Sequence, residues 1–124
     1  MRVPAKARVI DKTRRMNRLE SKFYSEYLTP LQLAGEITYA KFEGISLSLG
    51  SEGGPRLAYK PDFFTVYKDG SIHCWETKGS WEAKNARDGR TRVKLAASLF
   101  WMFHFHGVTL DKSRKTFLFE DFSL

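Results

Sequence analysis

Residues 60–78 read KPDFFTVYKDGSIHCWETK, and this stretch decides the fold. Two runs rich in aromatic and β-branched side chains, 63–67 and 71–77, flank the polar segment 68–70, which ends in a glycine. Two such runs around a short glycine-containing segment predict a β-hairpin. Successive side chains on a strand point to opposite faces, so the length of the turn decides which side chains meet across the hairpin.

Two turn lengths are open, and they place the carboxylates differently. A three-residue turn with Gly70 in the left-handed conformation sets Asp62 directly opposite Glu76, with β-carbons about 4.5–5.5 Å apart. A two-residue turn sets Asp62 opposite Thr77 instead, and the carboxylates then fall on different faces.

Glu76 and Lys78 share one face of the second strand. Two neighbouring carboxylates repel unless a cation lies between them, and oxygen donors with open positions favour Mg²⁺ or Mn²⁺. Such an ion generates hydroxide from water and stabilises a leaving oxygen, while Lys78 can orient the water or offset negative charge. The alternative is an exposed hairpin on which Glu76 and Lys78 form only a surface ion pair.

The flanking sequence predicts helices around a sheet. Asn17 and Glu20 form a capping-box pattern at the start of a helix that ends at Ala34-Gly35, with a kink or restart at Thr29-Pro30. Further elements follow from alternating or helical periodicity: strands over 36–42 and 45–49, a loop over 51–55, a helix over 91–103, and strands over 103–109 and 115–119. We therefore expect an α+β fold with a mixed central sheet of about four or five strands flanked by helices.

The length of 124 residues fits one domain, here residues 16–124, preceded by a basic arm over residues 1–15. No apolar run approaches the roughly 20 residues of a membrane span, and residues 1–15 lack the apolar stretch of a secretory signal. The single Cys74 cannot form an internal disulfide. These features indicate a cytoplasmic protein that does not enter membranes.

The formal net charge is +7, and the basic side chains are clustered. One cluster of basic side chains lies within residues 1–18 and the other within residues 84–94. We expect both clusters to contact phosphates, although a solvated tail and a solvated helix face explain them as well. The expected nucleic-acid-binding residues are Arg14, Arg15, Arg18, Lys84, Arg87, Arg90, Arg92 and Lys94.

Pro61-Asp62 followed by a hairpin and Glu76-Thr77-Lys78 resembles the PD-(D/E)xK nuclease superfamily. More closely, several segments are similar to small phage and prophage endonucleases described as Holliday-junction resolvases. The segments that carry this likeness, over roughly residues 16–109, are 19–24, 33–37, 59–63, 76–79, Trp81 and 92–94.

The resemblance implies a restriction-endonuclease-like core and assigns roles to named residues. It makes Asp62, Glu76 and the Thr77 backbone carbonyl the ligands of Mg²⁺, for which Mn²⁺ can substitute, and Lys78 the catalytic lysine. Glu20 approaches the same metal cluster, directly or through water; its other interpretation is a helix-capping acid. Residues 85–90 are expected to form a mobile loop at the mouth of the site.

These observations predict a Mg²⁺-dependent endonuclease that hydrolyses DNA phosphodiesters, with the catalytic set Glu20, Asp62, Glu76 and Lys78. The resemblance favours branched DNA and a homodimer, because symmetric junctions need paired cuts. The alternatives are a non-catalytic nucleic-acid-binding protein on a nuclease-like fold and a module that binds an acidic protein partner.

Other side chains with chemical potential are expected to be structural. His104 and His106 are expected on a sheet face, His73 on the face opposite Glu76, and Cys74 in buried packing. Trp81 is the exception, because an aromatic side chain in a loop beside the site can stack on an unpaired base.

Overall fold

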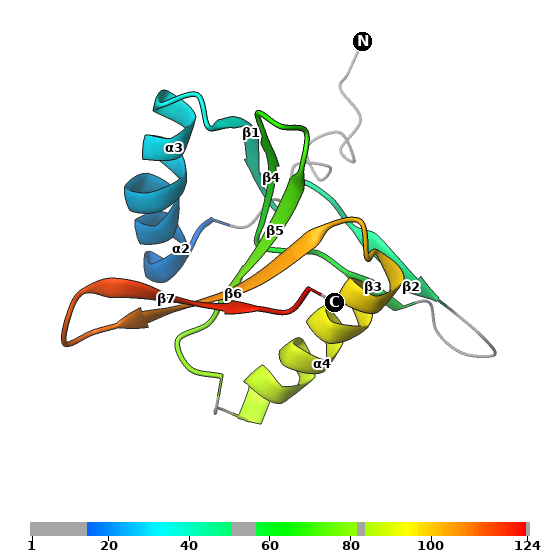
Figure 1. Ribbon diagram of the computed structural model, residues 1–124. Helices are drawn as coiled ribbons and strands as arrows, with labels where there is room; N and C mark the ends of the chain where they lie inside the picture. Colours follow the sequence, from blue (N-terminus) through cyan, green and yellow to red (C-terminus); the bar gives the residue numbers. More distant parts are fainter. Residues whose placement is uncertain (1–14, 51–56, 82–83, 124) are drawn as a thin grey trace, which may run out of the picture.

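The computed structural model describes residues 15–50, 57–81 and 84–123, and for residues 84–88 it describes the backbone alone. Its fold is α+β, as the sequence predicts, with a mixed five-stranded sheet flanked by helices (Figure 1). The elements are α2 (Arg18–Phe23), η1 (Tyr24–Leu28), α3 (Thr29–Leu33), β1 (Ile37–Phe42), β2 (Leu47–Gly50), β3 (Leu57–Tyr59), β4 (Phe63–Tyr67), β5 (Ile72–Thr77), α4 (Lys84–Leu99), β6 (His104–Asp111) and β7 (Thr116–Asp121).

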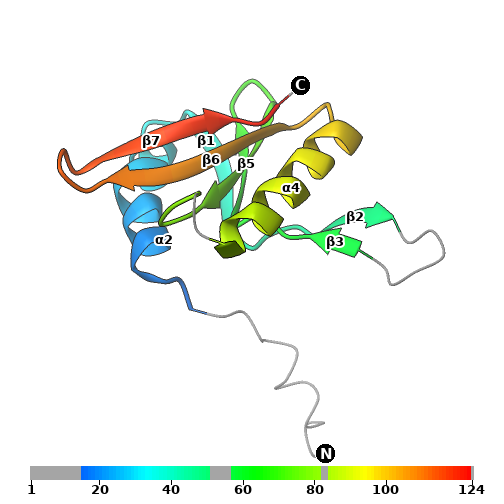
Figure 2. The same cartoon turned by 90° about the horizontal axis from the view of Figure 1, so that it is seen from below.

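The main sheet has the strand order β1-β4-β5-β6-β7. Among the described strands only β5 and β6 pair in parallel, and helix α4 makes the long crossover that a parallel pair requires. Strands β2 and β3 form a separate antiparallel pair beside α4 (Figure 2). The three residues of β3 have no alternation long enough to be recognised in the sequence, and this strand was not predicted.

The helical segment α2-η1-α3 covers one face of the sheet. Asn17 and Glu20 form the predicted capping box: each side chain accepts a hydrogen bond of 2.8 Å from the other's backbone N–H. Phe23 and Leu28 are fully buried in a cluster that includes Trp75 of β5. The capping residues therefore fix the start of a helix whose apolar face packs on the strand that carries Glu76.

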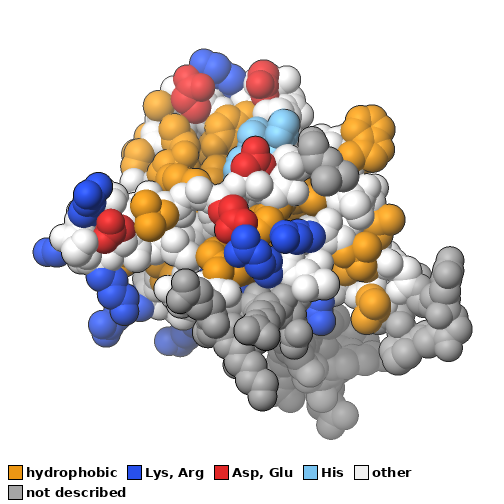
Figure 3. All heavy atoms as spheres, turned by 60° about the horizontal axis from the view of Figure 1, so that its bottom comes forward, with side chains coloured by type: hydrophobic (Ala, Val, Ile, Leu, Met, Phe, Trp, Pro, Cys, Tyr) orange, Lys and Arg blue, Asp and Glu red, His pale blue; other side chains and the backbone are white. Residues whose placement is uncertain are grey.

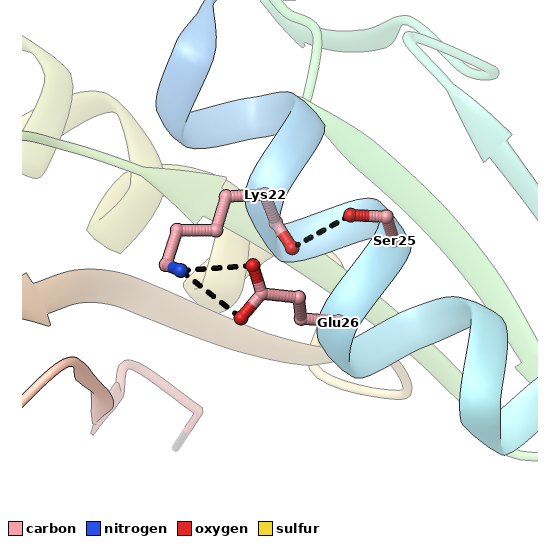
Figure 4. Close-up of polar contacts among 3 residues, drawn as sticks. All are labelled: Lys22, Ser25 and Glu26. Atoms are coloured by element: carbon pink, nitrogen blue, oxygen red, sulfur yellow. Dashed lines mark hydrogen bonds and ion pairs between the residues drawn. The ribbon is translucent and has the colours of Figure 1, made fainter.

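The predicted irregularity near Thr29-Pro30 is a five-residue π-helical turn, η1, followed by α3. Proline lacks the N–H that would continue the α-helical ladder, which favours an irregular turn just before it. On the outer side of this segment Lys22 Nζ lies 3.0 and 2.8 Å from the two carboxylate oxygens of Glu26, and Ser25 Oγ donates to the Lys22 carbonyl (Figure 4). The segment ends at Gly35, whose φ of +80° favours glycine.

Helix α4 covers the opposite face, where Val93, Ala96 and Ala97 pack in one cluster with Cys74 and Phe105. The predicted bounds of this helix, 91–103, are wrong at both ends. It begins at Lys84, because one glycine within a helix costs only about 1 kcal/mol and need not break it. It ends at Leu99, after which the backbone turns back through a hydrogen bond from Phe103 N–H to the Phe100 carbonyl.

The loop predicted over 51–55 and the arm predicted over 1–15 lie outside the described residues, except for Arg15. Where the chain is described, no helix combines the length and apolar character needed to cross a membrane.

Candidate functional site

The β4–β5 hairpin has the three-residue turn. Tyr67 N–H donates to the Ser71 carbonyl at 2.9 Å, Gly70 N–H donates to the Tyr67 carbonyl at 2.9 Å, and Gly70 has a φ of +86°. The register pairs Phe63 with Trp75. Asp62 precedes Phe63 and Glu76 follows Trp75, so in this antiparallel pair Asp62 stands across from Glu76. The interpretation with a two-residue turn is wrong.

Asp62 is held in place by Thr77. Its Oδ2 accepts hydrogen bonds of 2.9 Å from both the backbone N–H and the hydroxyl of Thr77, and only 7% of Asp62 is exposed. A carboxylate with two donors on one oxygen has a fixed orientation.

Glu76 is held between a tyrosine and a lysine. The Tyr59 hydroxyl donates to Oε1 at 2.9 Å, and Lys78 Nζ lies 3.3 Å from Oε2. The Glu76–Lys78 pair is thus present, but its carboxylate side chain is only 9% exposed. The pair consequently differs from the exposed surface ion pair of the alternative interpretation. Tyr59 comes from β3, so sequence analysis could not bring it to this carboxylate.

Burial and mutual repulsion control the protonation of the two acids. Burial, followed by the charge of Glu76, raises the pKa of Asp62 to about 7, although the Thr77 hydrogen bonds oppose this change. Burial also raises the pKa of Glu76, against the lowering effect of Lys78. Two such carboxylates are stabilised by a shared proton or by a cation.

Glu20 has the capping role considered for it, and it also lies near Asp62. It caps its own helix with Asn17, and its charge also contributes to raising the pKa of Asp62. The side chain is 2% exposed and lines the same cavity as Asp62. A third acid therefore lies close enough to Asp62 to affect its protonation.

Two cavities meet at Lys78, which lines both of them. The acidic cavity, of about 490 Å³, is lined by Asn17, Arg18, Leu19, Glu20, Asp62, Thr77, Lys78 and Gly79. The basic cavity, of about 460 Å³, is lined by Ser46, Ala58, Tyr59, Lys60, Glu76, Lys78, Gly89 and Arg92.

The donor set at this junction fits a hard divalent cation by its chemistry. Asp62 and Glu76 supply carboxylate oxygens, and Mg²⁺ commonly takes only one or two protein carboxylates and completes its shell with water and phosphate oxygens. In the described part of the chain, no group of three or more His, Cys, Asp or Glu side chains is arranged to hold a metal ion. The fit therefore rests on the two carboxylates.

The structure places the predicted phosphate-binding residues in different surroundings. Arg18 lines the acidic cavity and Arg92 the basic one, while Arg15 and Lys94 are exposed. Arg90 forms an ion pair with Glu120. Arg14 and the side chains of Lys84 and Arg87 lie outside the described residues.

The expected mobile loop over residues 85–90 is wrong, because these residues belong to α4. The guanidinium of Arg90 lies over the rings of Trp81 and Phe122, 5.9 and 5.4 Å from their centroids. Trp81 also packs edge to face on Phe122, with centroids 5.5 Å apart. The Trp81 ring thus packs against Phe122 and Arg90 and is partly exposed.

The three histidines form a stack that sequence analysis missed. His73 Nδ1 lies 2.8 Å from His106 Nε2, and the rings of His73 and His104 stack with centroids 4.3 Å apart. Figure 3 shows histidine side chains gathered on one face of the molecule. All three lie on sheet strands, as predicted, but their mutual contact depends on the parallel pairing of β5 with β6.

Comparisons with protein-family models, with curated proteins and with solved structures find no match to this chain.

Proposed function

We propose that this protein is a metal-dependent endonuclease that hydrolyses DNA phosphodiester bonds. The observation that carries the proposal is the pair of buried carboxylates, Asp62 and Glu76, beside the amine of Lys78 at the junction of two cavities. The resemblance of Pro61-Asp62 and Glu76-Thr77-Lys78 to the PD-(D/E)xK superfamily supports the same conclusion.

In the proposed site, Asp62, Glu76 and the Thr77 carbonyl hold Mg²⁺ or Mn²⁺, with Glu20 approaching from the acidic cavity. The bound ion supplies Lewis acidity and lowers the pKa of water. Thr77 keeps the Asp62 carboxylate oriented through its two hydrogen bonds, and Tyr59 does the same for Glu76. Lys78 orients the attacking water and offsets negative charge that develops on the phosphate.

The basic side chains would hold the nucleic-acid backbone, since phosphate contacts position a strand without reading its sequence. The sequence and its resemblance add three parts to the proposal. The substrate is branched DNA, the active form is a homodimer, and the location is the cytoplasm, that of the host if the enzyme is phage-encoded.

The test is cleavage of labelled four-way junction, fork, duplex and single-stranded DNA in Mg²⁺, Mn²⁺ or EDTA. We expect cutting that requires the metal, is greatest on the junction, and is lost in Asp62→Asn and Glu76→Gln. Glu26→Gln, at the exposed Lys22 pair, is the matched control and should cut normally. Binding without cutting in either metal would contradict the proposal and favour the non-catalytic binding protein.

A further inference from the structure

The basic cavity is built by segments that are distant in the sequence. Ser46 precedes β2, Tyr59 ends β3 and Lys60 follows it, and Arg92 lies on α4. Its volume of about 460 Å³ is within the range of roughly 300–1,000 Å³ that is usual for ligand sites. The cavity is thus a site formed by the fold and separate from the acidic cavity that holds Asp62.

The charges in this cavity favour an anion. Among the described residues that line it, Lys60, Lys78 and Arg92 are cationic and Glu76 is the one acid. Glu76 is already engaged by Lys78 and by the Tyr59 hydroxyl. Within the described part of the chain, no carboxylate forms an ion pair with Lys60 or Arg92. Two cationic groups therefore remain available to a ligand.

Gly89 keeps this cavity open next to Lys78. A β-carbon at position 89 would lie 3.2 Å from Lys78 Cε and 3.5 Å from Nζ. The absence of a side chain lets the Lys78 amine lie against the backbone of α4, one helical turn before Arg92. Lys78 can thereby face both the carboxylates and the basic cavity.

We propose that the basic cavity binds a phosphate of the substrate strand adjacent to the phosphate that is cleaved, through Lys60 and Arg92. This inference rests on the proposed function. The shared Lys78 supports it, because the cleaved phosphate would lie at the carboxylates on one side of this amine and the next phosphate on the other. Arginine suits such a site, since its guanidinium binds phosphate oxygens in pairs.

The first test measures binding of labelled single-stranded and junction DNA in EDTA by fluorescence anisotropy, so that cleavage plays no part. Lys60→Gln and Arg92→Gln should each weaken binding about fivefold and lower the slope of log K against log salt by about 1. The matched controls Lys112→Gln and Arg114→Gln, on the exposed turn between β6 and β7, should change binding less than twofold. Equal effects in all four variants would overturn the inference.

The second test locates the phosphate. A single uncharged methylphosphonate linkage is moved along the strand, and binding is measured for the original protein and for Arg92→Gln. At one position next to the cleaved bond, the uncharged linkage should weaken binding of the original protein about fivefold and leave Arg92→Gln unaffected. Loss at every position alike in both proteins would contradict a dedicated phosphate site.

The third test separates a strand phosphate from a free anion. Inorganic phosphate is titrated into the complex at constant ionic strength; we expect it to compete with DNA for the original protein and not for Arg92→Gln. Phosphate binding that depends on Arg92 and leaves DNA binding unchanged would assign the cavity to a free anion and overturn the inference. Failure of the proposed function gives a different result. The protein would then not cut DNA in Mg²⁺, but its DNA binding would still depend on Lys60 and Arg92, and the phosphate site would stand.

Discussion

The two faces of strand β5 carry ionisable groups of opposite charge type, a carboxylate on one face and an imidazole on the other. Glu76 and Cys74 face helix α4, whereas His73 and Trp75 face the other side of the sheet. Burial is the leading cause of the pKa changes on both faces. It raises the pKa of Glu76, and on the other side it lowers the pKa of His73 to about 4.

The difference lies in how the polar atoms are satisfied. His73 Nε2 lies 3.0 Å from Ser71 Oγ and Nδ1 lies 2.8 Å from His106 Nε2, so both ring nitrogens have protein partners. The His73 imidazole is therefore satisfied by hydrogen-bond partners within the protein. On the other face, Asp62 and Glu76 raise the energy of one another's charged form next to cavities open to a ligand. We infer that the histidine stack is structural and that the carboxylate pair is the functional side.

The largest effect is expected for Asp62→Asn, which removes one charge of the carboxylate pair and keeps an oxygen for Thr77. Cleavage should fall at least about 100-fold, because the site loses a metal ligand and no longer positions the attacking water and the phosphate. In EDTA at pH 8 the melting temperature should rise by a few degrees, since repulsion with Glu76 is relieved.

Thermal unfolding measured beside the cleavage assay checks both parts. His73→Gln supplies the contrast on the other face: it should lower the melting temperature, because it breaks the contact with His106, and leave cleavage within about twofold. A lower melting temperature for Asp62→Asn in EDTA would show that the carboxylate pair is structural as well.

The second prediction concerns Gly89→Ala, which separates the stability of α4 from the position of Lys78. Alanine favours a helix over glycine by about 1 kcal/mol, and the flexible end of Lys78 can move away from the new β-carbon. The free energy of unfolding should therefore rise by up to about 1 kcal/mol. Cleavage should fall about tenfold, because a displaced amine no longer meets the reacting phosphate.

Urea unfolding and single-turnover cleavage measure these two quantities in the same preparation. Ser98→Ala, on the exposed side of the same helix, is the control and should alter neither by much. A variant at position 89 that gains stability and keeps full activity would remove the role assigned to Gly89.

The hairpin shows how much of the site was predictable from sequence. The sequence predicted the hairpin and left two turn lengths open; the three-residue turn, which sets Asp62 across from Glu76, is confirmed. The helix start at Asn17 is also confirmed. It could be predicted because a capping box involves residues only three positions apart. Local interactions of this kind leave a readable pattern in the sequence.

The features that sequence analysis missed depend on contacts between distant segments. Tyr59 reaches Glu76 from a three-residue strand, and Gly89 approaches Lys78 only when α4 lies against the sheet. The histidine stack requires the parallel pairing of His73 with His104. Neither periodicity nor spacing encodes such contacts, since they arise from packing after the elements have formed.

The smallest expected effect is the pH dependence of stability, in which the two faces oppose each other. The pKa of Asp62 is raised from 3.8 to about 7, so the folded state holds more protons between these values and stability falls as the pH rises. The pKa of His73 is lowered from 6.5 to about 4, so the unfolded state holds more protons there and stability rises with pH. One proton corresponds to at most about 1.4 kcal/mol per pH unit, and partial exposure of His73 reduces its share.

Between about pH 4.5 and 6.5 the original protein should consequently show a melting temperature that changes little. Asp62→Asn should unmask the histidine contribution and become more stable as the pH rises, whereas His73→Gln should become less stable. Calorimetry in EDTA at constant ionic strength measures all three profiles. Parallel profiles for the three proteins would mean that neither face controls the pH dependence of stability. Mg²⁺ sharpens the comparison, because it binds the deprotonated carboxylates. It should stabilise the original protein more at pH 8 than at pH 5 and have little effect on Asp62→Asn.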